Sequence, residues 1–172
     1  MIISFDKLSG LRKKYRNKKI VFCSGSFDLP HAGHVLFFEE CKKLGDVLVV
    51  MVGRDDEMKI QKGPNRPIMN QDVRLKVVDS FKSVDFCFIN PPTPDTENLF
   101  DKVVPIFENL HPDIYAVNED AYDIPYRRKV AKKYGTKLIV LSRSCPKKFE
   151  NISTTKIIEK IKRELSPENF KK

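Results

Sequence analysis

Two of the three histidines in this 172-residue sequence, His31 and His34, lie three residues apart at the start of a helix-like segment. A strand-like apolar segment precedes them, and Gly33 stands between them. Imidazoles donate hydrogen bonds to phosphate oxygens, and the N–H groups at a helix N-terminus also attract anions. Gly33 has no Cβ, so an anion can approach the backbone closely. The spacing predicts a phosphate site, with a pair of ordinary surface histidines or a metal-binding pair as alternatives.

Strands and helices alternate along the chain, which predicts a Rossmann-like α/β fold: one domain with a doubly wound, five-stranded parallel sheet and helices on both faces. We expect strands over 19–24, 46–53, 84–89, 113–117 and 137–141, and helices over 5–16, 33–44, 70–81, 126–134 and 154–165. Residues 1–18 then form a basic helical extension, and 19–165 form the catalytic core. Ligands bind such sheets at the carboxyl ends of the strands, where the turn carrying both histidines lies.

Three finer expectations concern the connections and helix faces. The segment 54–67 is expected to be an irregular loop because it contains a glycine and two prolines, which leaves Lys59, Lys62 and Arg66 on that loop. A helix from about residue 95 to Leu110 is expected to kink or break at Pro105. Helical spacing predicts one inward face in the helix over 70–81 and an apolar stripe in the last helix: Val73, Val77 and Phe81, then Ile157, Ile158, Ile161 and Leu165.

The composition narrows the class of protein. The formal net charge of +9 suits an anionic partner such as a nucleotide or a phosphorylated substrate, and nucleic acid is a less favoured partner because no aromatic-rich RNA motif or zinc finger is present. The longest apolar run, Val47–Val52, is too short for a membrane span, and we see no signal peptide. Four scattered cysteines, Cys23, Cys41, Cys87 and Cys145, predict reduced thiols in a cytoplasmic protein rather than a metal cluster.

Several separate motifs carry a family resemblance. The first is Gly25-x-Phe-Asp-x-x-His-x-Gly-His34, followed by a helix that ends in Leu-Gly-Asp46. Further along come Lys62-Gly-Pro-Asn-Arg-Pro-Ile68, Arg74 and Ile152-Ser-Thr-Thr-Lys-Ile157. In this order they resemble the cytidylyltransferase-like nucleotidyltransferase superfamily with its HxGH motif, which includes glycerol-3-phosphate cytidylyltransferases and heptose-phosphate adenylyltransferases.

The resemblance implies transfer of NMP from an NTP to a phosphorylated sugar or polyol. The acceptor phosphate attacks the α-phosphate in line and pyrophosphate leaves, with Mg²⁺ accompanying the triphosphate. The loop Lys62–Ile68 favours ATP and a heptose-phosphate acceptor, whereas CTP with glycerol 3-phosphate is the close alternative. A flavin adenylyltransferase fits less well because the Ile152-Ser-Thr segment is closer to the sugar enzymes. A basic RNA-binding module is the alternative from another class.

The resemblance also implies the site residues. Catalytic roles fall to His31, His34 and Lys62, and substrate binding to Asp28, Arg66 and Arg74. Nucleotide binding falls to Ser24, Gly25, Ser26, Phe27, Gly33, Asn118, Asp120, Ile152, Ser153, Thr154 and Thr155. No protein metal site is expected, and relatives suggest a homodimer. From the residues alone, Lys62 can be a solvated lysine, Arg74 a surface ion pair and Ser153 a simple helix cap. Arg143 departs from the family spacing, so its place in the site stays open.

Overall fold

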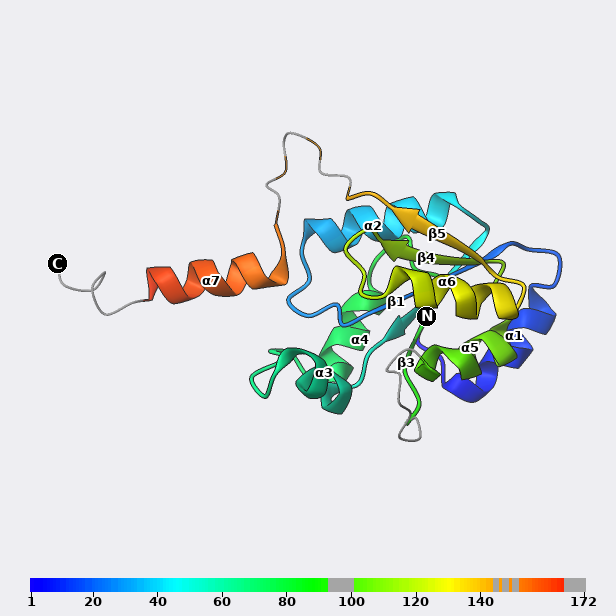
Figure 1. Ribbon diagram of the computed structural model, residues 1–172, viewed down its shortest axis with the longest axis horizontal. Helices are drawn as coiled ribbons and strands as arrows, with labels where there is room; N and C mark the ends of the chain where they lie inside the picture. Colours follow the sequence, from blue (N-terminus) through cyan, green and yellow to red (C-terminus); the bar gives the residue numbers. More distant parts are fainter. Residues whose placement is uncertain (93–100, 144–145, 147–148, 150–151, 166–172) are drawn as a thin grey trace.

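Five parallel strands form one sheet at the centre of the molecule, in the order β3-β2-β1-β4-β5 (Figure 1). The computed structural model describes residues 1–92, 101–143, 146, 149 and 152–165. The strands are β1 (Ile20–Gly25), β2 (Val47–Val52), β3 (Phe86–Ile89), β4 (Ile114–Asn118) and β5 (Lys137–Leu141). The helices are η1 (Phe5–Lys7), α1 (Leu8–Lys14), α2 (Ala32–Lys43), α3 (Asp55–Lys62), α4 (Gln71–Asp79), η2 (Asp101–Val103), α5 (Val104–Leu110), α6 (Ile124–Lys133) and α7 (Thr154–Glu164). The predicted doubly wound α/β sheet is confirmed, and its strand order reverses between β1 and β4.

Alternate residues of the strands contribute to two hydrophobic cores, one on each face of the sheet. In β1, Ile20 and Phe22 join a core with α1, α5 and α6, whereas Val21 and Cys23 join a core with α2 and α4. All six residues of β2 are buried, as expected for a central parallel strand covered on both faces. A register shift of one residue would send every side chain to the opposite core. The sheet therefore holds its strand ends, and the groups that follow them, in fixed places.

The N-terminal segment packs against this sheet. Leu8 and Leu11 of α1 are buried in the core that also contains α5. The amide of Ile3 donates to the Cys87 carbonyl at 2.9 Å, beside an isolated bridge from Ile2 to Cys87. Cys23, Cys41 and Cys87 are buried and free, in agreement with the predicted core thiols, and Cys145 lies outside the described residues.

The predicted irregular loop over 54–67 is wrong for its first half, because Asp55–Lys62 forms the helix α3. Its first turn is acidic and its last turn is basic, and these charges stabilise the helix because they interact favourably with its dipole. The helix ends at Gly63, whose φ of 94° is a conformation that other residues rarely adopt. The glycine and both prolines therefore follow the helix. Lys62 lies at the end of a helix, and only Arg66 lies on the loop.

The inward face predicted for α4 is also wrong at Val73, whose side chain is 44% exposed. Val77 and Phe81 are only partly buried, and the buried residues are Arg74, Leu75 and Val78. The Arg74 side chain sets this face because its guanidinium reaches buried backbone carbonyls. Apolar spacing alone cannot reveal a buried cation, so the predicted face was displaced by one residue.

Pro105 lies in the first turn of α5, directly after the short helix η2. A proline is tolerated there because the first N–H groups of a helix have no intrahelical partner. The predicted break at Pro105 is confirmed in the described part, whereas residues 93–100 of the predicted helix lie outside it. Between β5 and α7, residues 144–145, 147–148 and 150–151 also lie outside it.

The last helix, α7, extends away from the sheet (Figure 1). None of its eleven residues is buried, and Ile161 of its predicted apolar stripe is 49% exposed. Only its N-terminal turn approaches the body of the protein, through Thr154. The longest helix in the described part of the chain, α2, has 12 residues, and no helix there is long and apolar enough to cross a membrane.

Candidate active site

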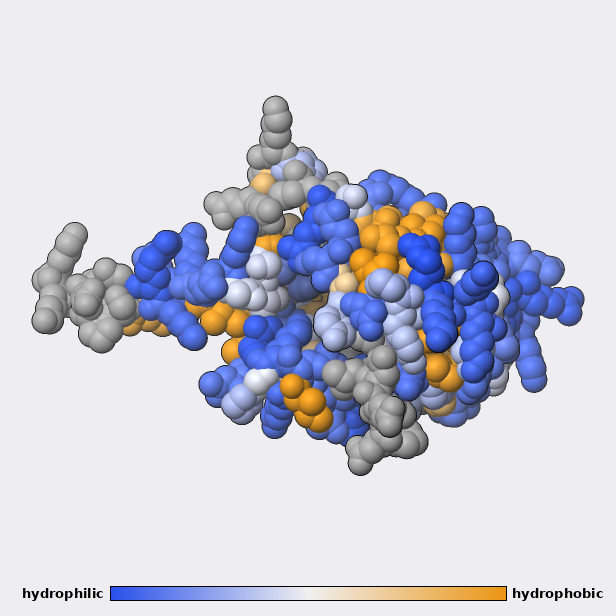
Figure 2. All heavy atoms as spheres, viewed as in Figure 1, coloured by the Kyte–Doolittle hydropathy of each residue, from blue (hydrophilic) through white to orange (hydrophobic). Residues whose placement is uncertain are grey.

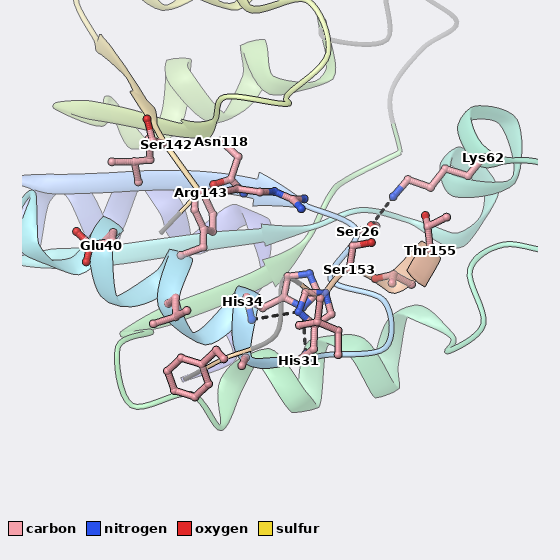
Figure 3. Close-up of a pocket in the computed structure, with 18 of the residues that line it drawn as sticks. Ser26, His31, His34, Glu40, Lys62, Asn118, Ser142, Arg143, Ser153 and Thr155 are labelled. Carbon is pink, nitrogen blue, oxygen red and sulfur yellow. Dashed lines mark hydrogen bonds between the residues drawn. The ribbon is translucent and has the colours of Figure 1, made fainter. Parts of the chain in front are cut away.

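A pocket of about 480 Å³ opens at the carboxyl edge of the sheet (Figure 3). It lies beside the end of β1, where Ser26 follows the strand, and beside Asn118 and Leu141, the last residues of β4 and β5. The predicted site residues that line it are Ser26, His31, Gly33, His34, Lys62, Arg66, Asn118, Ile152, Ser153, Thr154 and Thr155, and Arg143 joins them. Twelve residues from four separate parts of the sequence thus meet in one cavity at the point where strand order reverses.

The two histidines form a reciprocal cap at the start of α2. Nδ1 of His31 accepts a hydrogen bond from the Gly33 amide at 3.1 Å, and Nδ1 of His34 accepts one from the His31 amide at 3.4 Å. The rings stack with centroids 4.0 Å apart. A neutral imidazole whose Nδ1 accepts a hydrogen bond carries its proton on Nε2. Each ring therefore keeps an Nε2–H donor available for a ligand.

Both imidazoles are held in the neutral form. Burial, together with the neighbouring His31, Lys62 and Arg143, lowers the pKa of His34 to about 3 despite the opposing effect of the Asp28 carboxylate. Burial also lowers the pKa of His31, and Arg143 adds to this effect. At neutral pH the pair thus offers hydrogen-bond donors without needing an extra proton.

A second helix begins opposite the histidines. The Ser153 hydroxyl accepts from the Lys156 amide at 3.3 Å and caps α7, and the Thr154 hydroxyl donates to the Asp28 carbonyl at 2.7 Å. A Cβ placed on Gly33 would lie 3.6 Å from the Ile152 carbonyl oxygen, which shows how closely the two segments approach. The two helix N-termini therefore converge at the carboxyl edge of the sheet, and residues from both line one cavity.

Three cations line the same pocket, and they differ in how far carboxylates neutralise them. Arg66 pairs with Asp28 at 2.9 Å, and Arg143 pairs with Asp120 at 2.7 Å. Lys62 makes no ion pair with any described residue, and its Nζ donates to the Ser26 hydroxyl at 2.8 Å. Burial, with Arg66 and Arg74 nearby, lowers the pKa of Lys62 despite the opposing effect of Asp28. An anion in the pocket would relieve this repulsion, so Lys62 is the cation best placed to bind one.

Two predicted substrate-binding residues lie beneath the pocket rather than in its lining. Arg74 has a fully buried side chain that donates to the carbonyls of Ser26, Gly53 and Met69 and to the Asp55 carboxylate. The Asp28 side chain is also fully buried and binds the backbone of the loop that carries Arg66. Both residues hold together the segments that form the pocket.

Four predicted nucleotide-binding residues are also absent from the lining. The Ser24 hydroxyl lies 3.2 Å from the hydroxyl of the buried Tyr115. The Phe27 ring folds back over Gly25, where an added Cβ would lie 2.9 Å from the ring. Phe27 also packs edge-to-face on His34, with centroids 5.6 Å apart, and Asp120 binds Arg143. Phe27 and Asp120 thus contact residues of the lining, His34 and Arg143, without lining the pocket themselves.

The pocket is also lined by seven residues that were not predicted from the sequence: Ala32, Leu36, Phe37, Glu40, Leu141, Ser142 and Phe149. On α2, Ala32, Leu36 and Glu40 are spaced four residues apart and Phe37 lies three after His34, so the pattern of one helix face contained the signal. Figure 3 shows Lys62, Ser153 and Thr155 at one end of the pocket and Glu40 and Ser142 at the other, with the histidines between them. The lining thus combines these polar groups with the apolar side chains of Leu36, Phe37, Leu141 and Phe149.

The pocket offers few ligands for a protein-bound metal. Among the described residues, Glu40 is the only carboxylate in the lining, and no group of three or more histidine, cysteine or carboxylate side chains is arranged to hold a metal ion. The three lining cations would also repel one. The arrangement suits a metal ion that enters bound to a nucleotide.

Comparisons with known proteins agree with this geometry. The family model described as cytidylyltransferase-like matches residues 22–160. An FAD synthase of Ferroglobus placidus is 37% identical over 145 residues, which cover 84% of this chain and 88% of that protein. The bifunctional protein HldE of Pseudomonas putida is 37% identical over 148 residues, or 86% of this chain, and the chain spans only 28% of its length. A lipopolysaccharide core biosynthesis protein from Thermoplasma volcanium, of known structure, superimposes with a TM-score of 0.57 and 27% identity, covering 75% of this chain and 98% of that one.

Proposed function

The chain belongs to the cytidylyltransferase-like family, and we propose that it transfers AMP from ATP to the phosphate group of a sugar or polyol phosphate, with the release of pyrophosphate. The observation that carries this proposal is the single pocket in which two helix N-termini, two neutral histidines and Lys62 meet. These groups are all donors to anions. None of them is an activated nucleophile, which agrees with direct transfer between two phosphates rather than a covalent enzyme intermediate.

The residues support an in-line displacement. An oxygen of the acceptor phosphate attacks the α-phosphorus of ATP, a new P–O bond forms, and the P–O bond to pyrophosphate breaks. Negative charge builds on the α-phosphate oxygens in the transition state, where the Nε2–H groups of His31 and His34 can donate to them. Lys62 and the N–H groups at the start of α7 would bind the departing pyrophosphate.

Two acceptor classes follow from the relatives. The loop Lys62–Ile68, which resembles that of heptose-phosphate adenylyltransferases, favours a heptose-type sugar phosphate. The FAD synthase match favours FMN as a second candidate, because this chain covers nearly the whole of that protein. Both acceptors present a phosphate monoester to the same α-phosphate. They differ in whether a sugar or an isoalloxazine ring must fit beside the loop that carries Arg66.

We propose that Mg²⁺ enters the site with the nucleotide. The ion would neutralise part of the triphosphate charge and help to orient it, while the described residues supply only cationic and neutral donors near the phosphates. The protein's own contribution is then to position the two phosphates and to exclude water between them.

The test is a pyrophosphate-release screen in which ATP and CTP are each combined with heptose phosphates, glycerol 3-phosphate and FMN. We expect release with ATP and a sugar phosphate, and loss of release in the His34→Ala variant. Release only with FMN would move the assignment to flavin adenylylation, and release only with CTP would move it to a cytidylyltransferase. If His34→Ala were as active as the unaltered protein, the mechanism would be wrong. Tight, salt-sensitive RNA binding without pyrophosphate release with any pair would favour the RNA-binding alternative.

A further inference from the structure

The turn between β1 and α2 holds two residues in a backbone conformation that their side chains disfavour. Phe27 has φ 48° and Leu29 has φ 46°, which is the left-handed region that glycine adopts readily and bulky residues rarely enter. Asp28 stands between them. Strained backbone of this kind persists only where surrounding contacts determine it, and it is concentrated at functional sites.

Asp28 makes the contacts that determine this turn. Its Oδ2 accepts hydrogen bonds from Arg66 Nε at 3.0 Å and from the Ile68 amide at 2.9 Å, and its Oδ1 accepts one from the Met69 amide at 3.0 Å. Its backbone carbonyl accepts from the Thr154 hydroxyl at 2.7 Å. One residue therefore joins the histidine turn, the loop of Arg66 and the start of α7.

The Asp28 carboxylate has no exposed surface with which to contact a substrate. Burial alone would raise the pKa of this carboxyl, but the amides of Ile68 and Met69 and the Arg66 guanidinium together lower it below its usual value. The group is thus an anion satisfied by internal donors. Its position below the pocket excludes the substrate-binding role that the sequence suggested for it.

The turn also sets the position of His34. The Phe27 ring, which is buried, contacts His34 edge-to-face and Phe38 at a centroid distance of 4.9 Å. If the backbone at Phe27 relaxed to an ordinary φ, the ring would leave this place and His34 would lose its support. The strained turn therefore connects the buried carboxylate to a catalytic imidazole.

We infer that Asp28 is a positioning residue that pins the strained turn and thereby fixes the histidine pair, the Arg66 loop and the start of α7 relative to one another. Its catalytic readout rests on the proposed function. Asp28 thus has a different role from the two histidines of the same motif. His31 and His34 contact the nucleotide, whereas Asp28 acts through them. It also explains why Thr154, on a helix that otherwise extends away from the body, is tied to this turn.

The sharpest test combines Asp28→Asn with a change that removes the strain. The Asn side chain keeps the size of Asp but cannot accept from both amides and Arg66, so we expect kcat to fall on the order of tenfold or more. Adding Leu29→Gly, which makes a positive φ inexpensive, should restore much of that loss. Leu29→Ala is the matched control, since it shortens the side chain without freeing φ, and it should restore none.

Amide hydrogen exchange in the free protein gives a readout that does not depend on catalysis. In Asp28→Asn we expect faster exchange at Ile68, Met69 and the first turn of α7, and Leu29→Gly should reverse the change at α7. Thr154→Val should loosen α7 alone, and Thr154→Ser, which keeps the hydroxyl, should not. If Leu29→Gly and Leu29→Ala acted alike, or if Asp28→Asn kept normal exchange and normal kcat, the inference would be overturned. If the unaltered protein showed no transfer activity, the proposed function would fail while the exchange data still judged this inference.

Discussion

The amino and carboxyl edges of the sheet use charge in opposite ways. At the amino edge, an aspartate precedes each of three strands: Asp46 before β2, Asp85 before β3 and Asp113 before β4. Each carboxylate accepts a backbone N–H from a neighbouring strand or its approach, respectively from Lys19 at 2.7 Å, Leu48 at 2.6 Å and Ile20 at 2.7 Å. Nearby cations, including Arg12 and Lys42, complete these contacts. This edge satisfies its polar groups internally.

The carboxyl edge instead collects donors that face a cavity. His31, His34 and Lys62 point donors at the pocket, and of the three lining cations only Arg66 and Arg143 are paired with carboxylates. Figure 2 shows hydrophilic residues over much of the visible face, so surface charge by itself does not mark this site. What distinguishes it is a lining cation, Lys62, that no carboxylate of the described residues neutralises, next to two neutral histidines. Changes at the carboxyl edge should therefore abolish activity and spare stability, and changes at the amino edge should do the reverse.

The largest effect is expected from His34→Ala. Removing one preorganised donor to a developing oxyanion costs about 10²–10³ in kcat, and the free energy of unfolding should change little by comparison. Steady-state pyrophosphate release and urea unfolding measure the two quantities. His111→Asn is the matched control, because His111 lies at the end of α5, outside the pocket, and Asn tolerates its left-handed backbone. Equal losses in the two variants would show that the histidine pair has no special role.

Lys62→Met should lower kcat by about 10- to 100-fold, because a single cation near the leaving phosphates is lost while the apolar stem is kept. Lys59→Met is the control on the same helix: Lys59 is exposed and absent from the pocket lining. We expect Lys59→Met to keep full activity. If both variants behaved alike, α3 would contribute only general positive charge, and raising the salt concentration should then remove the difference from the unaltered protein.

Asp113→Asn tests the expectation that a change at the amino edge lowers stability and spares activity. Its carboxylate accepts from the Ile20 amide and from Arg12, and hydrogen bonds to charged groups contribute about 1.5–3 kcal/mol to stability. Because the side chain is 41% exposed, we expect the low end of this range. The urea midpoint should fall while kcat stays within a factor of about two, since 1 kcal/mol at this edge leaves the carboxyl ends of the strands in place. Loss of kcat with unchanged stability would contradict the claim that the amino edge supports stability and the carboxyl edge supports activity.

The sheet, its five strands and the place of the site could be predicted because they depend on periodicity and on a local motif. β2 is a run of six apolar residues, and His31-Ala-Gly-His34 is contiguous. The family resemblance implied that the Ile152-Ser-Thr-Thr155 segment binds the same nucleotide as the histidines, and the segment lines the pocket with them. These features involve neighbouring residues, which a sequence displays directly.

The roles of Asp28, Arg74 and α3 could not be predicted, because they depend on contacts between distant segments. Arg74 is buried only because the carbonyls of Ser26, Gly53 and Met69 converge on it in the folded state. Asp28 reaches Ile68 and Met69, 40 and 41 residues away in the chain. Buried polar groups are expensive unless paired, and the sequence shows the group but not the partner.

A last prediction concerns pH and tests whether His34 is neutral. Its pKa is lowered from 6.5 to about 3 in the folded protein, so between these values the unfolded chain binds a proton that the folded protein does not. Stability must therefore rise with pH across this window and be lost progressively as pH falls below 6.5, by at most about 1.4 kcal/mol per pH unit for one proton. Urea unfolding of the unaltered protein and of His34→Gln at pH 7 and pH 5 isolates this contribution. The difference in stability between the two pH values should be smaller in His34→Gln than in the unaltered protein. If His34→Gln kept the full pH dependence, His34 would not be held neutral at the start of α2. A protonated His34, rather than a neutral donor, would then bind the anion at the carboxyl edge.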